Sequence, residues 1–344
     1  MRALQPLETM NDSKPFVIDI HAHFTPKLLF ERFDSGLEKS TGTKLLHDNK
    51  GMSLLFPGDD APRAIMPRLT DIADRLAWMD NNGIDHQLVG GWLESFGYEL
   101  PPAQGLAWGR HMNRCMLDEL ANQPRFTALA TVPLQDGHLA ADALEEALEQ
   151  GFGGIMIGTL PQGDTGNLDD PSLDPFWEMA SRLEAAVFLH PMTFCGESRL
   201  DNYGLMNALG RLEDTSIAVA RLLFAGHLLR FPGMKLVLSH GGGTLPFALG
   251  RLARSYRNAK GKVADPVAGF AKMYFDSCVF DPEALEYLVR KAGSGHVMLG
   301  SDAPFPMGDP EPVHVITGGK FTGSEKLDIL GGNARKVFRV RAGC

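Results

Sequence analysis

Residues 16–23 read FVIDIHAH, an apolar run that ends in two histidines. The run has the composition of a buried strand, and side chains two residues apart along a strand point to the same side. His21 and His23 can therefore converge on one ion, because neutral imidazole nitrogens bind zinc, iron, nickel or manganese. By itself the pair is equally consistent with two surface histidines, so other parts of the sequence are needed to distinguish a metal site from exposed side chains.

Seven more apolar runs follow, separated by longer segments with the spacing of amphipathic helices. The eight runs are Phe16–Ile20, Ile84–Gly91, Phe126–Leu134, Gly153–Thr159, Ala186–Pro191, Lys235–Gly242, Met273–Val279 and His296–Pro304. Most are nearly continuous, as parallel strands buried on both faces are. Eight such units predict an α/β fold, a closed (β/α)8 TIM barrel, although seven or nine units would fit the pattern almost as well.

The length of 344 residues suits one barrel of about 250 residues with insertions. We expect residues 1–15 to form a loose N-terminal arm and residues 16–344 a single domain. Helices are predicted at Ile72–Asp80, at Leu139–Glu149 and after Asp281, where an aspartate precedes a proline in the manner of a capped N-terminus. Residues 25–68 and 192–214 interrupt the alternation, each after a predicted strand, so we expect both insertions at the mouth of the barrel.

The composition limits the partners of the protein. The net charge is −9 with no basic stripe, which argues against nucleic acid, and an anionic substrate would need a local arginine to bind. No apolar run of about 18 residues predicts a membrane span, and the residues before Phe16 lack the apolar region of a signal peptide. The four cysteines form no CxxC pair, so we expect a reducing, cytoplasmic compartment.

Three later predicted strands also end in ionisable residues. The fifth ends at His190, the sixth at His240 and the eighth at Asp302. Burying so many ionisable groups costs several kcal/mol unless a metal or another partner compensates, so the pattern indicates a metal site at the mouth. The remaining histidines are expected to be structural or exposed, and they are His47, His86, His111, His138, His227, His296 and His314.

These residues, together with two longer segments, resemble the amidohydrolase superfamily. The segments are FPGMKLVLSHGGGTLPFALGR at residues 231–251 and VMLGSDAPFPMG at residues 297–308. The likeness extends from about Phe16 to Phe338. It is greatest to the decarboxylase branch, in particular to the family of 2-amino-3-carboxymuconate-6-semialdehyde decarboxylases.

The resemblance implies that His21, His23, His190 and Asp302 bind one divalent metal, with zinc the first choice and manganese the second. It also implies that His240 acts as the acid and base beside the metal, so that His240 and Asp302 form the catalytic centre. Members with two metals use a lysine or glutamate on the fourth strand. Residues 153–159 read GGIMIGT and offer neither, which predicts a site for a single metal.

Two arginines are matched to substrate-carboxylate ligands of the family. Arg251 would reach the active site of a neighbouring subunit, which implies a homodimer, whereas Arg63 would act in its own chain. The plainer alternatives are an ion pair within the chain for Arg251 and a solvated loop position for Arg63. The chain departs from the family at Met192 and Ala303, where aromatic residues are usual, so the metal chemistry is expected to be kept and the substrate to differ.

We therefore expect a metal-dependent non-oxidative decarboxylase of an unsaturated or aromatic carboxylate. The same residues also fit a hydrolase of C–C, C–O or C–N bonds, or a hydratase, because the ligands alone do not select the reaction. A binding protein without activity is a third possibility, against which the intact ligand set argues.

Overall fold

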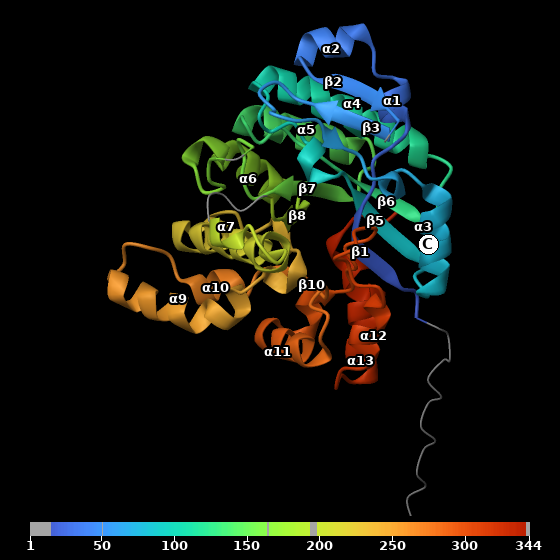
Figure 1. Cartoon of the computed structure of the whole chain (residues 1–344). Coiled ribbons are helices and arrows are strands. Elements are labelled where there is room, and N and C mark those ends of the chain that lie inside the picture. The colour runs from blue at the N-terminus through green and yellow to red at the C-terminus, as the bar shows by residue number, and fades with distance from the viewer. Residues whose placement is uncertain (1–14, 50, 164, 193–197, 342–344) are drawn as a thin grey trace, which may run out of the picture.

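Eight parallel strands form one sheet in the computed structural model, which describes residues 15–49, 51–163, 165–192 and 198–341 (Figure 1). In spatial order they are β1 (Ile18–His23), β5 (His86–Gly90), β6 (Phe126–Ala130), β7 (Gly154–Gly158), β8 (Ala186–His190), β9 (Lys235–Leu238), β10 (Tyr274–Asp276) and β11 (Val297–Met298). Each neighbouring pair is parallel. The strands are buried along their length, apart from partly exposed first residues of β9 and β10.

The last strand returns to the first and closes the barrel. The backbone N–H of Ile20 donates to the carbonyl of Leu299 at 2.9 Å, and Ala22 forms a parallel bridge with Ala303. The N–H of Asp302 donates to the carbonyl of His21 at 2.8 Å, which brings the ends of the first and last strands together. The predicted (β/α)8 barrel is confirmed.

Helices surround the barrel and follow the strands in sequence (Figure 1). Their bounds are α3 (Ile72–Asn81), α4 (Pro102–Leu120), α5 (Gly137–Glu149), α6 (Asp174–Arg182), α7 (Arg211–Ala225), α8 (His227–Arg230), α9 (Leu245–Ala259), α10 (Pro266–Phe270), α11 (Pro282–Ala292), α12 (Pro312–Thr317), α13 (Gly323–Leu327) and α14 (Asn333–Val337). The predicted cap of α11 is present, because the Asp281 side chain accepts a hydrogen bond from the backbone N–H of Glu283.

The first insertion contains structure that the sequence patterns did not predict. It forms two short helices, α1 (Leu28–Glu31) and α2 (Ser35–Thr41), and a three-stranded antiparallel sheet of β2 (Lys44–Asp48), β3 (Gly51–Leu55) and β4 (Arg63–Ala64). The second insertion is partly helical, since a π-helical turn at Met206–Gly210 runs directly into α7. Residues 193–197 of this insertion, and residues 1–14 of the predicted arm, lie outside the described residues.

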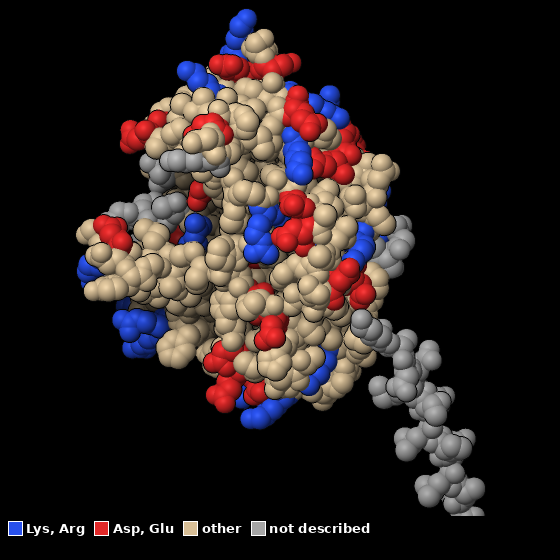
Figure 2. All heavy atoms as spheres, turned by 45° about the vertical axis from the view of Figure 1, so that its right-hand side comes forward, with Lys and Arg blue, Asp and Glu red and all other residues tan. Residues whose placement is uncertain are grey.

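Side chains from the strands and from the inner faces of the helices form a connected core that extends from Val17 to Phe338. None of the described helices is long and apolar enough to cross a membrane. On the face drawn in Figure 2, acidic and basic side chains are interspersed, and no basic stripe crosses that face.

Candidate metal centre

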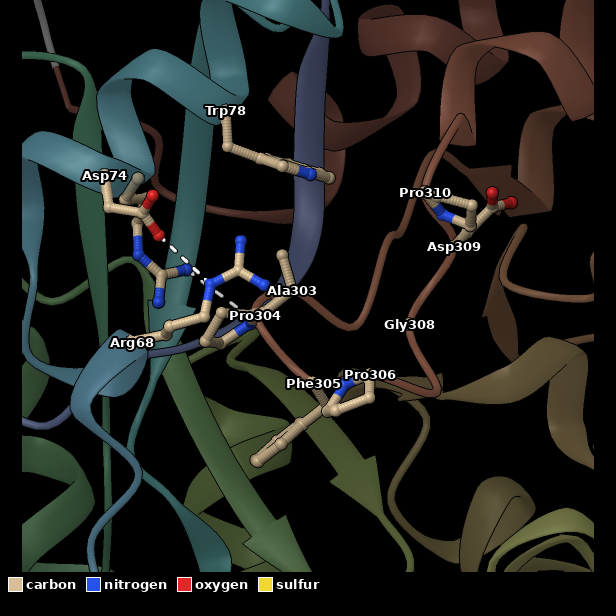
Figure 3. A pocket seen from close by; sticks show the side chains of 11 residues that line it. Arg68, Asp74, Trp78, Ala303, Pro304, Phe305, Pro306, Gly308, Asp309 and Pro310 are labelled. Carbon is tan, nitrogen blue, oxygen red and sulfur yellow. Dashed lines mark hydrogen bonds and ion pairs between the residues drawn. The ribbon is translucent and has the colours of Figure 1, made fainter.

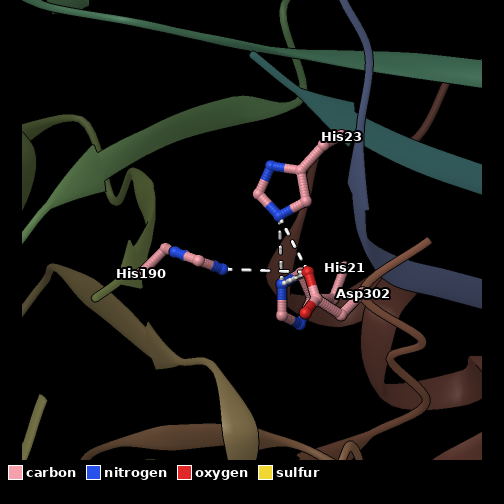
Figure 4. A group of neighbouring side chains, drawn as sticks. All are labelled: His21, His23, His190 and Asp302. Carbon is pink, nitrogen blue, oxygen red and sulfur yellow. Dashed lines mark hydrogen bonds and ion pairs between the residues drawn. The ribbon is translucent and has the colours of Figure 1, made fainter. Parts of the chain in front are cut away.

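Three histidines and one aspartate meet at the C-terminal ends of the strands (Figure 4). His21 and His23 come from β1, His190 ends β8, and Asp302 follows β11; all four are buried. One nitrogen or oxygen atom of each lies within 4.8 Å of those of the other three. Strands far apart in sequence thus bring together the four residues that the sequence analysis singled out as metal ligands.

The hydrogen bonds of the three histidines leave the same ring nitrogen free. Nδ1 of His23 donates to the carbonyl of Gly91 at 3.0 Å, and Nδ1 of His190 donates to the carbonyl of Pro191 at 2.8 Å. Nδ1 of His21 lies 2.6 Å from Oδ2 of Asp276. A carbonyl or carboxylate oxygen only accepts, so each Nδ1 carries a proton, which leaves Nε2 as the ring nitrogen that can bind a metal.

These ring nitrogens converge in a way that favours a cation. The Nε2 atoms of His21 and His23 lie 3.3 Å apart, and Oδ1 of Asp302 lies 3.2 and 3.1 Å from them. Nε2 of His190 is 3.8 Å from the same oxygen, and both of these atoms are buried without a hydrogen-bond partner. Ligands at about 2.0–2.1 Å around a tetrahedral metal stand about 3.3 Å from one another, so the group fits one metal ion.

The electrostatics of the group agree with this fit. Burial would raise the pKa of Asp302, but the neighbouring histidines hold the pKa of this carboxyl well below its usual range. Burial, together with the nearby rings of His23, His240 and His21, lowers the pKa of His190 well below its usual value. Burial would lower the pKa of His21, but the carboxylates of Asp302 and Asp276 raise it to about 10, so a metal that binds here displaces a proton from this ring.

His240 lies beside the metal centre but outside the ligand group. Its Nε2 is 3.5 Å from Oδ2 of Asp302, the carboxylate oxygen that does not face the other histidines. Both residues have left-handed backbone conformations, with φ of 52° at His240 and 62° at Asp302. Non-glycine residues adopt this conformation at a cost and are frequent at active sites.

The glycines that follow His240 allow this backbone path. Gly241, Gly242 and Gly243 all have positive φ. A Cβ on Gly243 would lie 2.3 Å from the carbonyl oxygen of Leu212, a position that a side chain cannot occupy. Glycine suits these positions because it adopts positive φ at little cost and lets the backbone approach a neighbouring segment closely.

Asp276 is a site residue that the sequence analysis missed. Its Oδ2 holds Nδ1 of His21, and its Oδ1 accepts backbone N–H bonds from Gly241 at 2.7 Å and Cys278 at 3.1 Å. Burial would raise its pKa, but its bonds to His21 and its neighbours lower the pKa below the usual value. Asp276 thus orients one of the four candidate ligands and fixes the loop that carries His240. Its only signal in the sequence was an aspartate within an apolar predicted strand.

Two connected hollows open on the metal centre. One, of about 190 Å³, is lined by His190 and Trp92, and the other, of about 360 Å³, is lined by His240 and Phe280. Both share four residues, which are Asp302, Asn207, Arg211 and Met307. We call them together the catalytic cavity.

Arg63 lies on β4 near this cavity, and its charge is already matched. Its guanidinium pairs with Asp59 at 2.6 Å and with Glu99 at 2.5 Å, and it lies over the ring of Phe56. Arg63 is therefore not a solvated loop residue. It lines a separate hollow together with Glu94 and Met192.

Arg251 is exposed on α9 and does not line the catalytic cavity of its own chain. Within the described residues its side chain has no hydrogen bond or ion pair, so the alternative of an ion pair within the chain finds no support. The neighbouring Phe247 on the same helix is 86% exposed.

A further cavity, of about 170 Å³, lies behind the loop that follows Asp302 (Figure 3). Arg68 and Asp74, which form an ion pair, and Trp78 line one side of it, and Pro304, Phe305 and Pro310 belong to the loop. Phe305 also lines the catalytic cavity and packs on His23, with ring centroids 4.9 Å apart. None of the four candidate metal ligands lines this further cavity.

Comparison with known proteins adds independent information. The amidohydrolase family model matches residues 18–340. A 2-amino-3-carboxymuconate-6-semialdehyde decarboxylase of Dictyostelium discoideum is 32% identical, over 92% of this chain and 90% of its own. A 5-carboxyvanillate decarboxylase of Sphingomonas paucimobilis superimposes with a TM-score of 0.78 and 25% identity, over 95% of this chain and all of that one. A gamma-resorcylate decarboxylase of a Polaromonas strain is 26% identical over 83% of this chain and 92% of its own.

Proposed function

This chain belongs to the amidohydrolase family, and we propose that it is a metal-dependent, non-oxidative decarboxylase of an unsaturated or aromatic carboxylate. The observation that carries the proposal is the convergence of His21, His23, His190 and Asp302, with His240 beside them in the lining of the catalytic cavity. The decarboxylase names of the relatives support this reaction over hydrolysis or hydration.

We propose that these four residues hold one divalent metal, zinc as first choice and manganese as second. Strand β7 is GIMIG and supplies no side chain that could bridge to a second metal. A bound metal of this kind supplies Lewis acidity to a substrate oxygen. The protein supplies the fixed imidazoles, the ionised Asp302 and a cavity that limits water.

His240 is proposed to deliver the proton. Its ring lines the larger part of the catalytic cavity, so a substrate held there lies within its reach. Protonation of the carbon that bears the carboxylate makes this carbon tetrahedral. The C–C bond to the carboxylate then breaks, and its electron pair restores the conjugated system. CO₂ leaves, and the proton stays on the carbon in its place.

We propose that Arg251 reaches the catalytic cavity of a second copy, so that the working form is a homodimer. Phe247 is exposed, and Arg251 on the same helix has no ion pair or hydrogen bond with any described residue, which together support a face that a second copy covers. Arg63 is proposed as a second contact of the substrate carboxylate, which must then compete with Asp59 and Glu99. We also propose a cytoplasmic location, which the free, buried Cys115 and Cys278 support.

The test is a screen of carboxylated aromatic and muconate-type acids with the metal-loaded protein, following CO₂. We expect CO₂ equal to the acid consumed, with no net uptake of water. Consumption of a substrate without CO₂, with water added to the product, would instead show hydrolysis or hydration. The Asp302→Ala variant is the matched control and should release no CO₂ from the same acid.

A further inference from the structure

Arg211 is a basic side chain of the catalytic cavity to which the sequence analysis assigned no role. It begins α7, directly after the π-helical turn at Met206–Gly210, and turns of this kind are frequent at functional sites. Arg211 lines both parts of the cavity, as Asp302 does. Among the described residues that line them, it is the only lysine or arginine.

The contacts of Arg211 orient its guanidinium without neutralising it. Nη1 donates to the carbonyl of Met192 at 3.1 Å and lies 3.4 Å from that of Pro191. Nη2 lies 3.7 Å from Oε1 of Glu94, whose side chain is 45% exposed. Carbonyl groups fix the direction of the guanidinium. Among the described residues, Glu94 is the one carboxylate within ion-pair distance of Arg211, at the outer limit of that distance, and Arg211 also interacts electrostatically with the buried Asp214.

Arg63 is a different case, because two carboxylates lie within 2.6 Å of its guanidinium. A substrate carboxylate that binds Arg63 must therefore displace, or share, a tightly held partner. Arg211 needs only the loosely held Glu94 to move aside. Of the two arginines, Arg211 is thus the better prepared to receive an anion from the cavity.

We propose that Arg211 anchors an anionic group of the substrate, and that the Glu94 carboxylate occupies Arg211 until this group displaces it. The proposal rests on the proposed function, because the molecule that Arg211 anchors is taken to be a decarboxylation substrate. Such a substrate is an acid with a second anionic group beside the reacting carboxylate. Asn207 lies four residues before Arg211 and lines the same two parts of the cavity, where its amide can complete the contact. Arginine suits the role because its planar fork pairs with two carboxylate oxygens at once.

The test compares two probes that differ by a single charge. Isophthalate carries two carboxylates, and 3-carbamoylbenzoate has nearly the same shape with one of them replaced by a neutral amide. Binding of each to the zinc-loaded protein is measured by calorimetry. The variants are Arg211→Gln, Glu94→Gln, their combination, and Arg221→Gln as the control; Arg221 lies on the same helix and pairs with Asp169.

We expect Arg211→Gln to weaken isophthalate binding about ten- to a hundredfold, the loss typical of a charge-assisted hydrogen bond, and to change 3-carbamoylbenzoate binding little. Glu94→Gln should instead tighten isophthalate binding by about two- to fivefold, because a competing ion pair of this kind is weak. This gain should vanish in the combined variant. Arg221→Gln should bind both probes like the wild type.

The two substitutions are expected to change isophthalate affinity in opposite directions, and this difference separates loss of an anchor from structural damage. Arg211→Gln alters the contacts that hold the carbonyl groups beside His190, but Glu94→Gln leaves them intact. An equal loss for both probes, a gain from Glu94→Gln that persists without Arg211, or a wild type that does not prefer isophthalate would each overturn the proposal. No turnover is involved, so a failure to release CO₂ from any acid would count against the proposed function alone.

Discussion

At the scale of single residues, Asp276 shows how the metal centre depends on a side chain outside the ligand group. Its carboxylate holds Nδ1 of His21 at 2.6 Å and thereby keeps Nε2 of that ring free. We expect Asp276→Asn to weaken metal binding about 10- to 100-fold, as is usual for a residue that orients a ligand. Competition with a chelator of known affinity measures this directly. An unchanged metal affinity would mean that the ring of His21 is held by packing alone.

His240 provides the complementary case, because it lies beside the ligands without belonging to them. We expect His240→Ala to keep its metal and to lose about 10²–10⁴-fold in rate, the usual contribution of a general acid and base. Metal content and CO₂ release are measured on the same preparation. Loss of the metal would make His240 a ligand, and near-normal turnover would remove it from the mechanism.

Site residues at the ends of strands could be predicted from the sequence, whereas site residues that reach the cavity from other elements could not. His21, His23, His190 and Asp302 could be found because each ends an apolar run, and the ends of barrel strands meet at one mouth. Arg211 gave no such signal. Its position depends on a π-helical turn in a long insertion, which no local pattern in the sequence predicted.

At the scale of the elements, the eight barrel strands were predictable because both of their faces are buried. The insertion sheet was not, since β2 reads KLLHD and four of its five residues are exposed. Such a strand is held by pairing with β3 rather than by burial of its own side chains. Periodicity records burial, so it misses strands whose stability comes mainly from their partners.

His86, at the start of β5, predicts how stability depends on pH. Burial, and then the charges of nearby arginines, lower its pKa to about 4. The unfolded chain, with a histidine pKa near 6.5, binds the proton first as the pH falls. Neutral His86 therefore gives its full contribution to the free energy of unfolding above about pH 6.5. This contribution is lost as the pH falls to about 4, and the loss is at most about 3 kcal/mol.

The measurement is the urea midpoint of the wild type and of His86→Gln at several pH values. We expect the wild type to lose more stability than the variant between about pH 6.5 and pH 4, because glutamine does not titrate. Other buried histidines titrate in both proteins, so the difference between the two curves isolates His86. Parallel curves would show that His86 titrates normally in the folded protein.

At the scale of the whole molecule, the proposed homodimer makes a prediction about mixed subunits. Arg251→Ala chains and Asp302→Ala chains should each be inactive. A mixed dimer contains one site with its full ligand set that receives Arg251 from the other subunit, so mixing should restore at most about one working site per mixed dimer. Subunit exchange is verified first with two differently labelled chains. Exchanged dimers without activity, or an active protein that sediments as a monomer, would contradict the shared site.

We expect decarboxylation to depend on one metal, held by four residues at the mouth of the barrel. The most direct test is a titration of the metal-free protein with zinc or with manganese while CO₂ release from an accepted acid is followed. We predict that release rises linearly and saturates at one metal per chain. Saturation at two metals per chain, or CO₂ release from the metal-free protein at the same rate, would contradict a single catalytic metal.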